Sequence, residues 1–151
     1  MDHSVKAGEL FFNGCNCAQA VFLAFSDVTG IDQKTASKLS STFGGGMGRM
    51  REVCGAVSGM LMVLGVLYGY EGTEEGNSRK REVYHAVQEL AGKFRTECGS
   101  IICRELLENP ASDPNPTPRT AEFYKQRPCA RMVVTAARLM DEYIAEHPIA
   151  E

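Results

Sequence analysis

The sequence lacks the charge pattern of a protein that binds nucleic acid. It has no Trp, and 16 Lys and Arg against 19 Asp and Glu give a net charge of −3 over 151 residues. Nucleic-acid-binding domains need clustered basic residues, and the basic run Arg79–Arg81 is followed directly by Glu82. We therefore expect no nucleic-acid partner.

The sequence also lacks a secretory signal and the cysteine density of a disulfide scaffold. The N-terminal residues do not follow the basic-then-apolar order of a signal peptide. Six cysteines in 151 residues fall below the roughly 8–10% that marks disulfide-rich domains. We expect a cytoplasmic protein, in a reducing compartment where cysteines serve reactivity or metal binding more often than crosslinking.

One uncharged run, Val53–Tyr70, has the minimum length for a membrane span. It carries two G-x-x-x-G pairs, which also suit close helix packing. No second such run exists, and the flanking segments are amphipathic. A helix that is apolar all round is equally typical of the centre of a soluble bundle, so we expect no membrane insertion.

Hydrophobic periodicity predicts an all-α fold: a single domain, residues 1–151, of about five to seven helices around Val53–Tyr70. One bundle of this size would leave part of the apolar helix uncovered, which favours a homodimer. Asn109–Pro118 holds four of the six prolines and predicts an irregular crossing segment. The other expected helices are Val5–Phe12, Cys17–Val28, a helix capped by Asp32, Asn77–Glu97, and one from Cys129 to before Pro148.

Four of the six cysteines fall at predicted helix starts: Cys17, Cys54, Cys103 and Cys129. Asn16 with Gln19 resembles a capping box, Ser100 is a candidate cap, and Pro128 suits a first helical turn. A helix start favours an anion, and the thiolate is the reactive form of cysteine. We expect these thiols to converge on one site. The alternative for each is a buried cysteine that only fills the core.

Other sulfur and histidine chemistries are not indicated. The sequence has no C-x-x-C pair and no C-x-x-C-H motif, so zinc ribbons, thioredoxin-type sites and covalently attached haem are not expected. The three histidines stand far apart, which favours structural or solvent-exposed roles. Cys15 lies in a turn and Cys98 at a helix end, where the dipole disfavours a thiolate, so both are secondary candidates.

A glycine-rich turn, Gly44–Gly48, precedes Cys54. It lacks the Gly-Lys-Ser/Thr of a P-loop and follows no strand. We expect a tight reversal whose N–H groups face a sulfur anion near Cys54. The candidate cofactor-binding residues are Gly45, Gly46, Arg49 and Gly55.

The phrase Cys54-Gly-Ala-Val-Ser-Gly59 resembles the CGAxxG signature of the C_GCAxxG_C_C family of redox-active proteins. The phrases around Cys17, Phe43, Gly65 and Cys103 are also similar to that family, and the resemblance covers most of the chain. Its four characteristic cysteines fall, by order and context, on the four helix-start cysteines. A related domain occurs in split-Soret cytochromes, which hold an iron–sulfur cluster besides haem. The resemblance therefore implies redox activity, allows a cluster, and does not imply haem.

Three functions remain open. The first is a redox or electron-transfer protein, such as a thiol–disulfide oxidoreductase, in which Cys54 or Cys129 attacks and another thiol resolves the disulfide. Its partner would be a redox protein or a small thiol or electron carrier. The second is a metal-binding protein in which the same four cysteines hold a [2Fe–2S] cluster or zinc. The third is a non-catalytic helical module that forms an oligomer.

Overall fold

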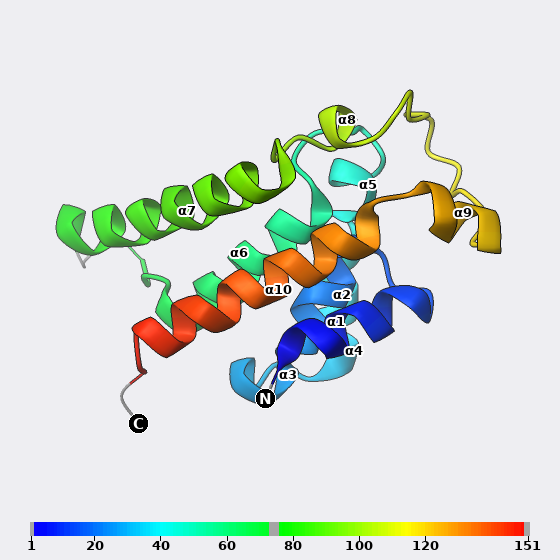
Figure 1. Ribbon diagram of the computed structural model, residues 1–151. Helices are drawn as coiled ribbons and strands as arrows, with labels where there is room; N and C mark the ends of the chain where they lie inside the picture. The colour runs from blue at the N-terminus through cyan, green and yellow to red at the C-terminus, as the bar shows by residue number, and fades with distance from the viewer. Residues whose placement is uncertain (1, 73–75, 150–151) are drawn as a thin grey trace.

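The computed structural model describes residues 2–72 and 76–149, and within these ranges the protein is all-α (Figure 1). Six helices have seven or more residues, and no strand occurs among the described residues. The long helices are α1 (His3–Phe12), α2 (Cys17–Ala24), α4 (Gln33–Ser41), α6 (Gly55–Tyr68), α7 (Gly76–Cys98) and α10 (Cys129–Glu146). The short ones are α3 (Ser26–Thr29), α5 (Gly44–Met47), α8 (Cys103–Leu106) and α9 (Ala121–Gln126).

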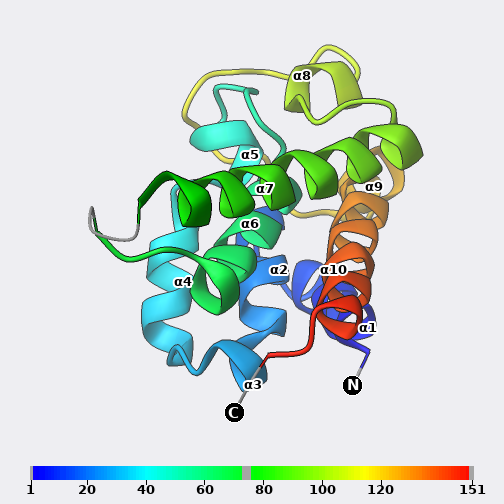
Figure 2. The ribbon, with the colours of Figure 1, turned by 90° about the vertical axis from the view of Figure 1, so that its left-hand side faces the viewer.

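The centre of the bundle is shared by α2 and α6. Helix α2 packs against α1, α4, α6 and α10, and α6 also packs against α7 and α10 (Figure 2). Fully buried side chains of α2 and α6, among them Phe22, Met60 and Leu64, form the core together with α10. The expected all-α bundle is confirmed. Its centre holds the shorter helix α2 as well as the apolar helix α6.

Glycine lets these two central helices approach closely. A Cβ atom added to Gly59 would lie 2.7 Å from the carbonyl oxygen of Ala18, and one added to Gly55 would lie 3.1 Å from Cys17 Cβ. The first G-x-x-x-G pair therefore forms the contact face toward α2. The far end of α6 is more open, with Val66 43% exposed; the homodimer stays a prediction.

Local capping signals fix most helix starts as expected. Asn16 and Gln19 form a reciprocal capping box, and the Asp32 side chain accepts from Thr35 N–H. The helix predicted over Cys17–Val28 instead ends at Ala24 and resumes as α3. The reason is local, because Ser26 Oγ donates to the Leu23 carbonyl and hydroxyl groups of this kind compete with helical hydrogen bonds.

Two details near the C-terminal half differ from the sequence prediction. Ser100 is not the cap of α8, whose N-cap is Ile102; its hydroxyl accepts from Ile102 N–H and donates to Glu105. The short α9 was not predicted, because six residues carry too little periodicity to show a helix.

None of the helices in the described ranges is both long enough and apolar enough to span a bilayer.

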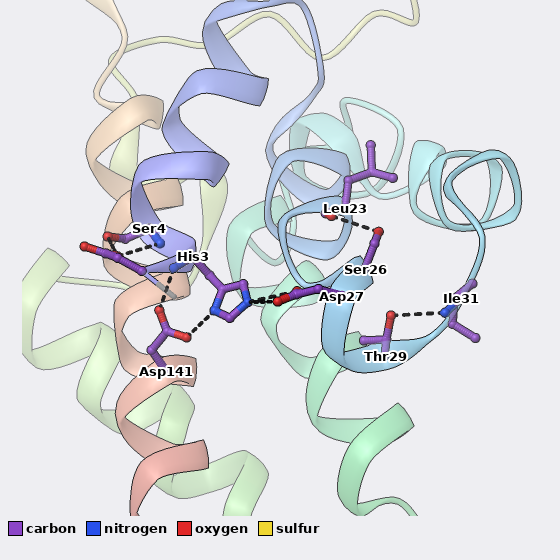
Figure 3. Close-up of polar contacts among 9 residues, drawn as sticks. His3, Ser4, Leu23, Ser26, Asp27, Thr29, Ile31 and Asp141 are labelled. Atoms are coloured by element: carbon purple, nitrogen blue, oxygen red, sulfur yellow. Dashed lines mark hydrogen bonds and ion pairs between the residues drawn. The ribbon is translucent and has the colours of Figure 1, made fainter.

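A buried histidine ties three helices together at the end of the bundle opposite α8. His3 is 5% exposed and its ring stacks on Phe25, with centroids 4.1 Å apart. Figure 3 shows the ring between two carboxylates: Nδ1 lies 2.5 Å from Asp141 Oδ1, and Nε2 lies 2.9 Å from Asp27 Oδ1. The structural role expected for the histidines therefore holds for His3, which links α1, α3 and α10.

Removing the Asp141 carboxylate is expected to destabilise the fold. In Asp141→Ala, the His3 backbone N–H and ring Nδ1 both lose a partner. Because Asp141 is itself partly exposed, we expect a loss of about 1–2 kcal/mol of unfolding free energy. Urea unfolding measures it, with Glu142→Ala as the control, since that carboxylate pairs with Arg138 at the surface. Equal effects of the two substitutions would contradict the structural role of His3.

Candidate functional site

A short backbone pairing places Cys54 beside Cys103. Val53 and Ile102 form an isolated antiparallel bridge. The Cys54 N–H donates to the Ile101 carbonyl at 2.7 Å, and the Cys103 N–H donates to the Glu52 carbonyl at 2.6 Å. Cys54 is then the N-cap of α6 and Cys103 the first residue of α8. Two cysteines far apart in the sequence thus enter one end of the bundle together.

Cys17 and Cys129 approach the same place from the other side. Each is the first residue of its helix, α2 and α10, and these helices pack against each other. Of the neighbouring groups, Cys17 has the largest effect on the pKa of Cys129, and Cys54 and Cys103 also act on the pKa of Cys17. All four cysteines line one cavity of about 300 Å³. Figures 1 and 2 show α5, α8 and the start of α10 at the same end of the bundle.

Cys129 is the one cysteine of the four that favours its thiolate form. The hydrogen bond from Cys17 lowers its pKa most, and the charges of Arg127, Arg119 and Arg51 lower it further. These effects outweigh burial and bring the pKa of Cys129 to about 7, from an ordinary value of 9.0. The structure therefore provides a nucleophilic thiolate near neutral pH.

The expectation that the helix start holds each cysteine as an anion is wrong for the other three. The hydrogen bond to Cys129 and burial raise the pKa of Cys17 well above its ordinary value. Burial raises the pKa of Cys54 to about 12, although the N–H groups of Ala56 and Val57 face its sulfur. Burial also raises the pKa of Cys103, against the effect of a nearby arginine. At Cys54 and Cys103 the loss of water outweighs the helix start, and at Cys17 the interaction with Cys129 does so together with burial.

The glycine turn is held by its own backbone hydrogen bonds. The N–H groups of Met47 and Gly48 donate to the carbonyl oxygens of Phe43 and Gly44, so these two do not face a sulfur anion. For the other N–H groups of the turn the expected direction stays a prediction. At Gly46, with φ of 71°, a Cβ atom would lie 2.7 Å from Cys103 Cβ. The turn thus packs its bare backbone against a site cysteine. Gly45, Gly46, Arg49 and Gly55 all line the cavity, and their role in holding a cofactor stays a prediction.

The site contains arginines that the sequence did not assign to it. Arg51 is 4% exposed, and its Nη1 lies 3.8 Å from Cys103 Sγ. Arg119 follows the proline-rich segment, and its Nη2 donates to the Cys15 carbonyl at 2.9 Å. Arg49, the predicted candidate, bonds to the Asp113 carbonyl and to Thr117 Oγ1, which tie the proline-rich segment down. Arg51 is close to Cys54 in the sequence, whereas Arg119 gave no signal beyond its charge; the direction of both side chains depends on tertiary structure.

The two secondary cysteines stay outside the cavity. Neither Cys15 nor Cys98 is among its described lining residues. Burial raises the pKa of both thiols, so neither is activated. Cys98 is the last residue of α7, as expected.

The fit of a metal can be tested on the described side chains. Among residues 2–72 and 76–149, no group of three or more His, Cys, Asp or Glu is placed so as to hold a metal ion. In this arrangement the four thiols do not provide the ligand geometry of a single metal ion such as zinc. The metal-binding hypothesis stays a prediction for metal analysis to test.

Comparison with known proteins assigns the chain to a family. The family described as "Putative redox-active protein (C_GCAxxG_C_C)" matches residues 15–143, which include all four cysteines of the cavity. No curated protein and no solved structure matches the chain. The matched range covers most of the sequence, and the chain belongs to the C_GCAxxG_C_C family.

Proposed function

We propose that the protein is a thiol–disulfide redox protein in which Cys129 is the attacking thiolate and Cys17 the resolving thiol. The observation that carries the proposal is that these two cysteines begin helices that pack against each other and line the same cavity, where the Cys17 thiol helps to lower the pKa of Cys129 to about 7. Disulfide formation requires two thiols that can approach each other. The family description, redox-active, supports the same class of chemistry.

The proposed reaction is a two-electron exchange with a disulfide substrate, either on a partner protein or on a small carrier. The Cys129 thiolate attacks one sulfur of that disulfide, breaks the S–S bond and releases one thiolate, which takes up a proton. Cys17 then gives up its proton and attacks the Cys129 sulfur of the mixed disulfide. The second substrate thiol leaves with that proton, and a Cys17–Cys129 disulfide remains.

The other two site cysteines have a different part in this proposal. Cys54 and Cys103 stay protonated at neutral pH because burial raises the pKa of each. Cys54 was one of the two candidates for attack on sequence grounds; its raised pKa argues for Cys129 instead. Both thiols keep the wall of the cavity apolar beside the reactive pair.

Mass spectrometry of the oxidised protein tests this assignment. After anaerobic purification, full reduction and treatment with one equivalent of a small disulfide, we expect a single crosslink, Cys17–Cys129. Cys17→Ser is expected to stop at the mixed disulfide on Cys129, whereas Cys98→Ser, outside the cavity, should form the crosslink as the unchanged protein does.

Two results would contradict the proposal. Random pairing among the six cysteines would indicate that no pair is prearranged. One equivalent of zinc or two of iron in the anaerobic preparation, with all four thiols blocked to alkylation until the metal is chelated, would favour the metal-binding alternative.

A further inference from the structure

The cavity beside the four cysteines concentrates positive charge. Four arginines line it, and neither Asp nor Glu is among the described lining residues. The chain as a whole has a net charge of −3, so the cavity opposes the average charge of the molecule. A cavity of one charge sign with apolar walls attracts ions of the opposite sign. The arginines are Arg49, Arg51, Arg119 and Arg127.

Arg51 is the decisive residue because one of its nitrogens is buried without a partner. Its Nε donates to the Ala111 carbonyl at 2.9 Å, and its Nη1 lies 3.8 Å from Cys103 Sγ. Its Nη2 has no hydrogen-bond acceptor within the part of the chain that the structure describes. A buried, charged donor left without an acceptor costs free energy. A ligand that accepts from Nη2 would recover that cost.

The arginine is held in place by the backbone and by its neighbours. Arg51 has a φ of 62°, a left-handed conformation that a residue with a side chain rarely adopts. The bond to Ala111 fixes the side chain against the proline-rich segment. Arg119 is also fixed, since its guanidinium lies 4.7 Å from the Phe11 ring centre and 4.8 Å from that of Phe123. Donors already fixed in position bind a ligand at little cost in side-chain entropy.

The size of the cavity and the geometry of the donors limit the ligand. A volume of about 300 Å³ is at the lower end of the range for small-molecule sites. Guanidinium groups match the oxygen atoms of carboxylates, phosphates and sulfates. We propose that this cavity binds a free small oxyanion, which accepts a hydrogen bond from Arg51 Nη2 and lies beside the Cys17–Cys129 pair. Binding needs no thiol chemistry, so this inference goes beyond the proposed function.

Equilibrium dialysis of radiolabelled sulfate against the reduced, full-length protein tests the proposal. We expect one saturable site per chain, measured at constant ionic strength set with sodium chloride. Arg51→Met removes the charge. Arg51→Lys keeps the charge but removes the planar guanidinium group and its paired N–H donors. Loss of a hydrogen bond to a charged group predicts that each variant binds sulfate about tenfold more weakly or worse.

A matched control and a conservative variant keep the test decisive. Arg104 pairs with Glu52 at the surface and does not line the cavity, so Arg104→Met should bind sulfate as the unchanged protein does. If Arg51→Met fails to fold, as judged by circular dichroism, the folded Arg51→Lys variant gives the result. No saturable binding, or equal weakening in Arg104→Met and Arg51→Lys, would overturn the proposal.

Competition separates a free oxyanion from a larger ligand that carries one. Inorganic phosphate should displace labelled sulfate at least as well as AMP does. Tighter displacement by AMP would overturn the assignment to a free small oxyanion. The variant Cys17→Ser/Cys129→Ser should still bind sulfate. If that variant binds sulfate but the unchanged protein forms no Cys17–Cys129 crosslink, the result counts against the proposed function alone. If the unchanged protein forms the crosslink but the variant does not bind sulfate, the result counts against this inference alone.

Discussion

Iodoacetamide is expected to modify Cys129 about 100- to 1000-fold faster than Cys54 at pH 7. With a pKa of about 7, half of Cys129 is thiolate at that pH. With a pKa of about 12, the protonated form of Cys54 exceeds its thiolate by a factor of about 10⁵ at pH 7. The weaker intrinsic nucleophilicity of a low-pKa thiolate offsets about two of those five powers of ten. Time-resolved alkylation followed by peptide mass spectrometry measures both rates.

The pH profile separates ionisation from simple access to the reagent. Because the folded pKa of Cys129 lies below its ordinary value, its alkylation rate should rise with pH, pass its midpoint near 7 and level off below pH 9. In Cys17→Ala the hydrogen bond is lost, and the midpoint should move upward. A rate in the unchanged protein that still climbs tenfold per unit between pH 8 and 9 would show that Cys129 is not activated.

Replacing Gly59 with alanine is expected to destabilise the fold by about 2–3 kcal/mol, because the new methyl group overpacks the contact between α2 and α6. Its Cβ would lie 2.7 Å from the Ala18 carbonyl oxygen and 3.0 Å from Val21 Cβ. A backbone atom cannot turn aside as a flexible side chain can, so the helices must separate. Urea unfolding monitored by circular dichroism measures the loss.

The same substitution six residues further along α6 provides the control. A Cβ atom at Gly65 would meet no neighbouring atom within 4 Å. Gly65→Ala should therefore stabilise the protein by about 0.5–1 kcal/mol, through helix propensity alone. If both substitutions change stability in the same direction, the close approach at Gly59 does not control the packing of these helices.

The positions of Cys17 and Cys129 could be predicted because the signals that start their helices are local. Asn16 with Gln19 marks the start of α2, and Pro128 that of α10, within a few residues of the cysteine concerned. Helical periodicity gave the all-α class and the long helices for the same reason. The short α9 and the break after Ala24 were missed, because they depend on one or two hydrogen bonds rather than on a repeated pattern.

The electrostatics of the site could not be predicted from neighbours in the sequence. Whether a cysteine ionises depends on burial and on partners that fold brings from elsewhere, as Cys17 and Cys129 show. The direction of Arg51 depends on a left-handed backbone that local preferences disfavour for arginine. Only the tertiary structure distinguishes the charged thiol from the three neutral ones.

The first and last site cysteines are about 110 residues apart, so a bond between them would close most of the chain into one loop, for which the loop-entropy account gives up to about 4.7 kcal/mol of added stability. If the proposed thiol–disulfide reaction occurs, the protein would alternate between a more stable oxidised form and a less stable reduced form. The chain must also emerge from the ribosome as far as Cys129 before the two sulfur atoms can meet. Unfinished chains would therefore lack the activated thiolate, and reactivity would begin only with completed folding.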